Sequence, residues 1–105
     1  MVTDEQVERA ADFIRDNAED FAKAKALRIY NEEYRKSLKA ILFNENEGSA
    51  AVRENLAYAD ERYLKHLEDL KTSVFEEEKL RGLTKAAEMK IELYRTSSAN
   101  QRGRL

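Results

Sequence analysis

The chain has 105 residues, of which 38% are charged and 42% hydrophobic, with a net charge of −2 and a pI near 5.5. This length suits a single domain, and the acidic balance argues against a protein that coats nucleic acid over its whole surface, although one basic face could still bind locally. The sequence contains no cysteine, which excludes disulfides and thiolate metal sites and is compatible with a reducing cytosol.

The scarcity of turn residues predicts few, long helices. The sequence has no proline and only three glycines, and it lacks alternating apolar runs, which argues against a sheet. It also lacks an apolar run near the ~18 residues of a membrane span, and its start, MVTDEQVERA, does not read as a signal peptide. We therefore expect an all-α cytoplasmic protein.

The first predicted element is a short N-terminal helix over residues 3–16. Thr3 and Gln6 form a capping box, so the helix should begin near Asp4. Its apolar face does not continue into the next stretch; it comprises Val7, Ala10, Phe13 and Ile14. We expect a break at 15–17 with Asn17 as a new N-cap, and the alternative is one long helix that changes partners there.

The second element, residues 17–44, is a helix with two stripes. On a wheel of about 100° per residue, one arc is apolar and typical of a coiled-coil seam. It comprises Leu27, Tyr30, Tyr34, Leu38 and Ile41. A second arc, centred roughly 140° away, is basic. It comprises Lys25, Arg28, Arg35, Lys36 and Lys39. The arrangement predicts that the apolar arc meets a partner helix and that the cations point to solvent.

A loop and a short helix follow over residues 45–59. The polar cluster around Gly48 marks the loop, Ser49 can cap a helix from Ala50 to Leu56, and Asp60 can cap the next helix.

The last helix should span residues 60–97 and carries two apolar stripes. The first comprises Tyr63, Leu67, Leu70 and Val74, and the second comprises Leu80, Leu83, Ala87, Ile91 and Tyr94. Two faces indicate two partners: one half can pack on the basic helix, and the other on the N-terminal helix or on a second subunit. We expect residues 98–105 to form a frayed tail.

Together these elements predict a long antiparallel helical hairpin, coiled-coil-like, with a short N-terminal helix. Because so slender a fold has a small core, we expect a homo-oligomer. The predicted core or oligomer seam comprises Leu27, Tyr30, Tyr34, Leu38, Ile41, Leu80, Leu83, Ile91 and Tyr94.

Chemical motifs are missing from the sequence. His66 is the sole histidine, so we expect it to face solvent rather than bind a metal. Glu76, Glu77 and Glu78 fan around the helix and should form a solvated face, or a contact with the basic stripe of another helix. We predict no enzyme, no catalytic residue, no cofactor, no metal and no small-molecule substrate.

The basic stripe is the best functional candidate. Its five cations span about 21 Å of helix, which suits contacts with several phosphates of a nucleic-acid backbone. A solvated face opposite a core seam is the alternative.

Three segments of the sequence resemble a group of small phage and prophage proteins found among recombination and replication genes. They are the AKAKALRIYNEEYRKSLKA arm, the AYADERYLKHLEDL corner and the KIELYRTSSANQRG end. The group typically has tryptophan where Tyr94 stands and a longer loop near Gly48. The order of parts is also loosely similar to recombination mediators of the UvsY type, which bind single-stranded DNA and oligomerise through a long C-terminal helix.

Two functional hypotheses follow from these observations. The first is a phage recombination or replication accessory, in the cytoplasm of the bacterial host, that binds single-stranded DNA or its associated proteins through the basic stripe. The second is a protein-interaction module, such as a phage adaptor or inhibitor of a host protein, that binds no nucleic acid.

Overall fold

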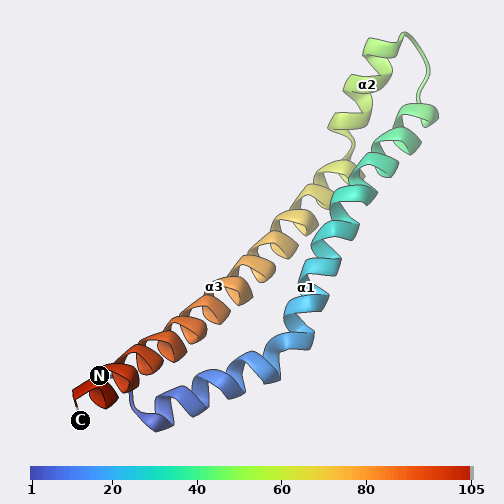
Figure 1. The fold of residues 1–105 in the computed structure, drawn as a ribbon. Coiled ribbons are helices and arrows are strands. Elements are labelled where there is room, and N and C mark those ends of the chain that lie inside the picture. The colour runs from blue at the N-terminus through green and yellow to red at the C-terminus, as the bar shows by residue number, and fades with distance from the viewer. Residues whose placement is uncertain (105) are drawn as a thin grey trace. The chain divides into compact units, whose positions relative to one another are not determined.

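The computed structural model describes residues 1–104, with side chains as far as Gly103, and is all-α over this range. Helix α1 spans Asp4–Glu45, α2 spans Ala50–Ala59 and α3 spans Glu61–Arg104 (Figure 1). None of these helices combines the length and the apolar composition that a bilayer crossing needs.

The chain forms two compact units, and α1 and α3 contribute to both. Unit 1 comprises Met1–Ala22 together with the chain from Glu78 onward, and unit 2 comprises Lys23–Glu77, including α2. In each unit a segment of α1 packs antiparallel to a segment of α3. In unit 1 Tyr94 bonds to Asp4, and in unit 2 Arg28 bonds to Glu77. The predicted antiparallel hairpin is therefore present within each unit.

The predicted start of the first helix is confirmed. The backbone N–H of Thr3 donates to the Gln6 side chain at 2.9 Å, and the backbone N–H of Gln6 donates to the Thr3 hydroxyl at 3.2 Å. This reciprocal pair satisfies two amide groups that a helix otherwise leaves without partners.

The predicted break at 15–17 is wrong, because α1 continues through it. The Asn17 amide donates to the carbonyl oxygen of Phe13 at 3.0 Å, one turn back, so this side chain is satisfied inside the helix instead of capping a new one. The division into helices at 3–16 and 17–44 is replaced by a single helix.

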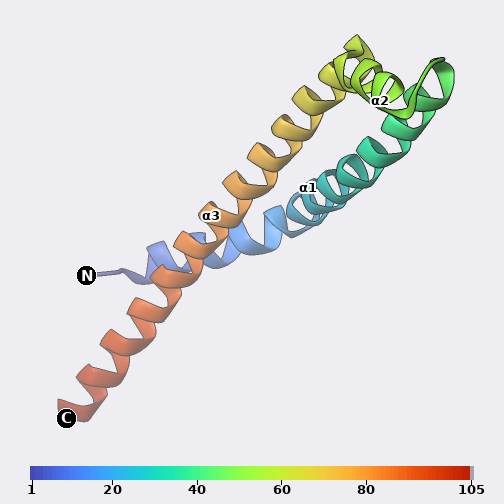
Figure 2. The ribbon, with the colours of Figure 1, turned by 90° about the horizontal axis from the view of Figure 1, so that it is seen from above.

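The predicted loop and short helix at 45–59 are confirmed, with α2 ending three residues later than expected. At Gly48 the backbone has φ +115°, a conformation that other residues rarely adopt. The Ser49 hydroxyl accepts the N–H of Val52, and the Asp60 carboxylate accepts the N–H of Arg62 at 2.8 Å, so both predicted caps form. Figure 2 shows α2 between the end of α1 and the start of α3.

The predicted end of the last helix is wrong, because α3 continues to Arg104. No proline stands in this stretch to stop it. Residues 98–104 are therefore helical. Leu105, the remainder of the predicted frayed tail, lies outside the described residues.

The buried positions follow a seven-residue spacing. In α1 they fall in two series that continue from unit 1 into unit 2. The first series comprises Ala10, Asn17, Ala24, Asn31 and Leu38, and the second comprises Ile14, Phe21, Arg28, Arg35 and Leu42. The seam of α3 comprises Tyr63, His66, Leu70, Ser73, Glu77, Leu80, Thr84, Ala87, Ile91 and Tyr94. This heptad spacing confirms the coiled-coil-like packing but with a different set of residues.

Most of the predicted seam of α1 faces outward. The side chains of the predicted set other than Leu38 keep large exposed fractions: Leu27 53%, Tyr30 62%, Tyr34 39% and Ile41 49%. The prediction that they form the core within the chain is therefore wrong. In the second half of α3, Leu80, Ile91 and Tyr94 are half-buried as predicted, whereas Leu83 is 45% exposed.

The apolar core of unit 2 lies at its α2 end. It comprises Leu38, Leu42, Ala57 and Tyr63, with Phe43 and Leu67 packed against it. The α1 helix reaches this core through Leu38, Leu42 and Phe43, because the earlier seam positions Arg28, Asn31 and Arg35 carry polar side chains.

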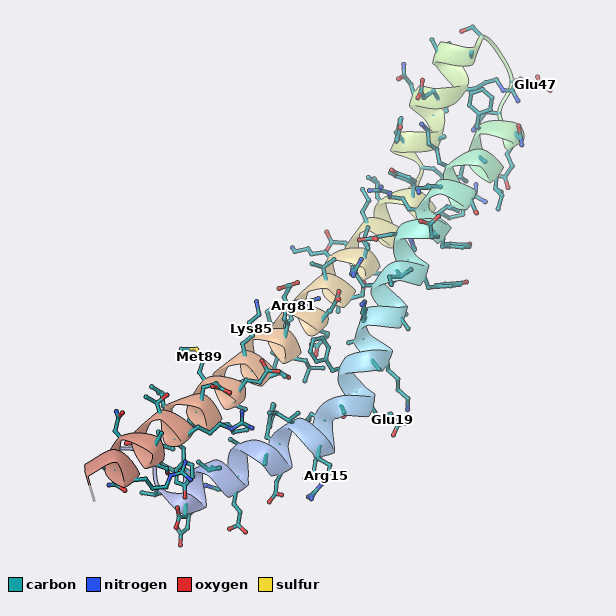
Figure 3. The ribbon with its side chains drawn as sticks, viewed as in Figure 1. Arg15, Glu19, Glu47, Arg81, Lys85 and Met89 are labelled. Carbon is teal, nitrogen blue, oxygen red and sulfur yellow. The ribbon has the colours of Figure 1, made fainter. Side chains whose placement is uncertain are left out.

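The core of unit 1 is thin and built from small side chains. Ala10 and Ala87 are buried, and Phe21 lies beneath the Arg81 guanidinium, 5.6 Å from the ring centre. Lys85 and Met89 point away from α1, as Figure 3 shows. The second half of α3 thus packs on the N-terminal segment, one of the two partners the sequence allowed.

Candidate functional site

The structure divides the predicted basic stripe instead of presenting it as one surface. Arg28 points into the contact between α1 and α3, where it donates through Nε and Nη2 to the Glu77 carboxylate, the latter bond measuring 3.1 Å. Its Nη1 donates to Glu32 at 3.1 Å. These bonds, that to Glu77 first, raise the pKa of the Arg28 guanidinium.

Glu77 is buried, with 1% of its surface exposed, so at this position the solvated acidic face is wrong and the alternative, a contact with the basic stripe of another helix, is confirmed. A buried carboxylate is stable only when charged donors face it. Arg28 supplies two of them in the bidentate geometry that suits a carboxylate. The pair therefore fixes the alignment of α1 against α3.

Lys39 holds α2 against α1. Its ammonium group donates to Glu54 at 3.1 Å and lies 4.3 Å from the centre of the Tyr58 ring. The contact with Tyr58, and then that with Glu54, raises the pKa of Lys39. Both partners come from α2, so this cation has a structural role inside unit 2.

The other three predicted cations are placed differently. Lys36 pairs with Glu33 at 3.3 Å on the surface, Lys25 is exposed, and Arg35 is half-buried at a seam position. Two cations of the five therefore remain exposed, and one of these lies beside a carboxylate. The uninterrupted row of positive charge expected from the wheel is not formed.

A polar layer occupies the middle of the unit 2 seam. The Asn31 amide donates to the Ser73 hydroxyl at 3.2 Å, and His66 Nε2 lies 2.7 Å from the carbonyl oxygen of Asn31. His66 is 7% exposed, so the expectation of a solvent-facing histidine is wrong. Among the described residues no buried side-chain polar atom lacks a hydrogen-bond partner. Satisfied polar layers of this kind specify alignment more than they add stability.

The outward apolar face of α1 is the strongest candidate surface. We define the α1 stripe as Leu27, Tyr30, Tyr34 and Ile41. The Tyr30 and Tyr34 rings stack with their centres 6.0 Å apart, and the Tyr34 ring also meets the edge of His66. Four large apolar side chains, each at least 39% exposed, lie along one side of the helix, and exposed apolar side chains gathered in this way mark binding surfaces.

A groove runs beside the α1 stripe between α1 and α3. It has a volume of about 360 Å³, with Ala24 and Leu27 on the α1 side. Asp69 and Glu76 are the charged residues that line it, on the α3 side. The stripe is therefore bordered by an acidic edge along α3.

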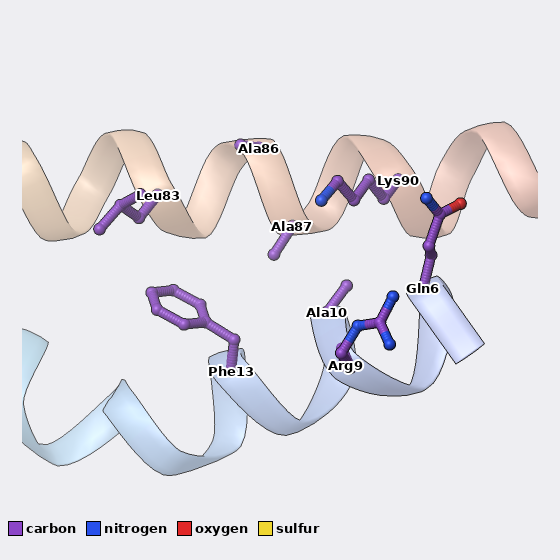
Figure 4. Close-up of a pocket in the computed structure, with 8 residues that line it drawn as sticks. All are labelled: Gln6, Arg9, Ala10, Phe13, Leu83, Ala86, Ala87 and Lys90. Carbon is purple, nitrogen blue, oxygen red and sulfur yellow. The ribbon is translucent and has the colours of Figure 1, made fainter. Parts of the chain in front are cut away.

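Unit 1 contains a second groove, of about 280 Å³, shown in Figure 4. Ala10 and Ala87 point toward each other from the two helices, Ala86 lies at the edge of the groove, and Phe13 and Leu83 lie at one end. Arg9 and Lys90 lie toward the other end, where Arg9 is 3.9 Å from Glu5. The small side chains leave this space because they do not fill the gap between the helices.

Metal-binding clusters of three or more suitable side chains do not occur within residues 1–104. Comparison of the chain with protein-family models, with curated proteins and with solved structures finds no match. The resemblance to small phage proteins therefore stays a prediction.

The sequence pattern did contain a clue to the true seam. Asn31 shares a heptad position with Ala10 and Leu38. Arg28 shares another heptad position with Arg35 and Leu42. The buried Glu77 stands in the matching phase of α3. A search for heptads that admits polar residues would have found this seam, whereas a search for apolar residues alone finds the stripe.

Proposed function

We propose that this protein is a protein-interaction module that binds another helix through the α1 stripe. The observation that carries the proposal is the outward position of Leu27, Tyr30, Tyr34 and Ile41 on a helix whose inward seam is already occupied. An apolar row at intervals of three, four and seven residues matches the anchors that helix-in-groove recognition uses.

The ion pairs of unit 2 support this proposal over a surface for polyanions. Arg28 and Lys39 contact Glu77 and Glu54, so their charge is already balanced inside the fold. A phosphate group would have to displace those carboxylates, and in the case of Arg28 would leave a buried charge without its partner.

Binding of single-stranded DNA, as an accessory in phage recombination or replication, remains the second proposal. The exposed Lys25 and Lys36 support it, since both lie on the same flank of α1. Two cations predict weak binding that disappears with moderate salt, because affinity for nucleic acid scales with the number of phosphates contacted.

The first experiment places a photoreactive amino acid at position 30, in the stripe, and at position 29, on another face of the same helix. Ile29 is 44% exposed and Tyr30 62%, so both positions are accessible to a photoreactive side chain. After irradiation in living cells we expect protein adducts from position 30 and few from position 29. Equal adduct formation at both positions would contradict the proposal.

The second experiment is a mobility-shift titration with single-stranded DNA at about 50 mM salt. We expect no shift for the natural chain. The informative variant for the DNA proposal is Lys25→Glu with Lys36→Glu, because these side chains lie outside the seam. Binding that this variant abolishes, while Leu27→Glu with Ile41→Glu retains it, would establish the second proposal and remove the first. Replacing Arg28 instead would disrupt the contact with Glu77 and confuse folding with binding.

A further inference from the structure

We propose that the occupant of the α1 stripe is a second copy of this chain, with the two α1 helices antiparallel and related by a two-fold axis at Tyr34. This inference rests on the proposed protein-interaction function and names its partner. It commits to a symmetric dimer in which the same patch on both copies forms the interface.

The two outer residues of the stripe are symmetric about Tyr34, whereas the position that mirrors Tyr30 is Leu38, which is buried in the core of its own chain. Leu27 and Ile41 stand seven residues before and after Tyr34. In an antiparallel pair centred there, Leu27 of each copy faces Ile41 of the other, and the two Tyr34 side chains meet at the axis. The contact covers two heptads, or about 21 Å of helix.

The rim of the stripe permits close approach of a second helix. On the side away from α3 it carries Ala26, Ser37 and Ala40, whose small exposed side chains allow interaxial distances of about 8–10 Å. Glu33, the acidic residue on this rim, lies beside Lys36 at 3.3 Å. The rim therefore brings no large side chain and little net charge to the interface.

The charges at the two ends of the stripe favour the antiparallel arrangement. Lys23 lies at its N-terminal end, whereas Glu45 and Glu47 lie at its C-terminal end. Lys23 and Glu45 stand eleven residues before and after Tyr34, so an antiparallel pair brings Lys23 of each copy beside Glu45 of the other, whose carboxylate also accepts from Arg62 of its own chain at 2.6 Å. A parallel pair would set like charges together, and the helix dipoles also favour the antiparallel one.

The available area fits a dimer of moderate affinity. The four exposed side chains of the stripe offer roughly 400 Å² of apolar surface per copy, given that aromatic side chains cover about 150–250 Å² each. With the rim and the edge of the groove, the buried area approaches the low end of specific interfaces, about 600 Å² per partner. We therefore expect a Kd in the range of about 1–100 μM.

The composition of the seam explains why this surface should be covered. The middle of the unit 2 seam is made of Arg28, Glu77, Asn31, Ser73 and His66 rather than of apolar side chains. Tyr30 and Tyr34 of α1 lie outside it. Pairing two copies buries those side chains and gives unit 2 a second apolar layer, a common remedy for small folds.

The test is sedimentation velocity of the full chain from about 1 to 500 μM, a range that brackets the expected Kd. We expect a shift from monomer to dimer with rising concentration. Leu27→Glu with Ile41→Glu should weaken dimerisation at least about 100-fold, because the two substitutions on each copy place four charges in the dimer interface. Ile29→Glu, on another face of α1, should leave the Kd unchanged within about threefold.

Cysteine cross-linking tests the orientation, since the natural chain has no cysteine. A mixture of Leu27→Cys and Ile41→Cys chains should give the mixed disulfide-linked dimer, and neither chain alone should cross-link efficiently. Cross-linking of Leu27→Cys chains with one another would overturn the antiparallel arrangement.

A chain that remains monomeric over the whole concentration range would overturn the dimer. If position 30 still formed stripe-specific adducts with another protein, the dimer would fail while the proposed function stood. If position 30 formed no adducts and the chain were monomeric, both would fail, so the two failures are distinguishable. Circular dichroism confirms that each variant is folded.

Discussion

The seam of unit 2 is polar at its centre, whereas the seam of unit 1 is built from alanine and half-buried apolar side chains. Both follow the same seven-residue spacing. In unit 2 the contacts Arg28–Glu77 and Asn31–Ser73 can form in only one alignment of the helices. In unit 1 the alanines Ala10 and Ala87 pack closely, and the hydrogen bond that crosses between the helices stands at the end of the unit, where Tyr94 donates to Asp4. Identical spacing thus supports two designs, one that specifies alignment and one that permits close approach.

The largest effect should come from Glu77→Ala in unit 2. Removing the carboxylate leaves the Arg28 guanidinium in the helix contact without its buried partner, so we expect the free energy of unfolding to fall by about 4 kcal/mol. Urea unfolding followed by circular dichroism measures it. Glu78→Ala is the control, because its exposed pair with Arg81 should contribute about 0.5 kcal/mol or less. Equal losses would show that Glu77 does not fix the alignment.

The next effect tests the apolar end of unit 2. Leu42 has no exposed surface, so Leu42→Ala should lower the free energy of unfolding by about 3 kcal/mol through the cavity it leaves. Ile41→Ala, at the neighbouring exposed position, should cost less than about 1 kcal/mol in the monomer. The measurement is urea unfolding at low protein concentration. A larger loss of stability from Ile41→Ala than from Leu42→Ala would show that Ile41 belongs to the core, as the sequence predicts.

A substitution in unit 1 tests the close approach of its helices. Ala87 is 7% exposed against α1, so Ala87→Leu should overfill the contact and cost about 1.5 kcal/mol. Ala86→Leu, at an exposed position on the side of α3 away from α1 (Figure 4), should be close to neutral because its side chain can extend into solvent. Thermal unfolding of the two variants compares them. A loss from Ala86→Leu as large as that from Ala87→Leu would contradict the comparison.

Replacing a polar residue of the unit 2 seam by an apolar one should change the free energy of unfolding little and the alignment of the helices more. Asn31→Leu removes the bond to Ser73, whose hydroxyl still donates to the Leu70 carbonyl at 2.8 Å. We expect the free energy of unfolding to change by less than about 1 kcal/mol. Amide NMR spectra should show additional peaks from a second alignment of the helices. A single set of peaks together with a large loss of stability would indicate that Asn31 contributes energy rather than specificity.

The smallest effect concerns pH at the start of α3. The pKa of Asp60 lies below its ordinary value of 3.8. The larger cause is the hydrogen bond from the Arg62 side chain, and the second is the bond from the Arg62 backbone N–H. This lowered pKa adds stability above pH 3.8 that disappears as the pH falls through the pKa of the folded state. Asp60→Asn keeps an acceptor for the cap but cannot titrate, so its stability should depend less on pH below about 4. If the stability of Asp60→Asn falls with pH as steeply as that of the natural chain, Asp60 is not the group responsible for this pH dependence.

Local signals at the helix ends were predictable from sequence because each depends on residues within a few positions. The Thr3–Gln6 capping box and the Ser49 and Asp60 caps form as expected. The break at Asn17 was mispredicted because the same amide can cap a helix or bond one turn back within it. The heptad spacing of buried and half-buried residues continues before and after Asn17, which favours one unbroken helix.

The candidate site was predictable only in part. The sequence predicts that Leu27, Tyr30, Tyr34 and Ile41 share a face and form a core or oligomer seam; the core within the chain is wrong, and the oligomer seam stays a prediction. Hydrophobicity alone places such a row inside. The structure places it outside, because the inward side of α1 meets Glu77, Ser73 and His66.

By itself, the sequence determined that the chain is helical, where the helices begin, and which residues share a face of α1. These properties follow from propensity, capping and a period of 3.6 residues, all of which act within one segment. Only the tertiary structure decided which face of α1 turns inward. That choice depends on a carboxylate 49 residues from Arg28 along the chain. A buried charge pair stabilises its own alignment and excludes the others, so the polar face became the seam and the aromatic face was left for a partner.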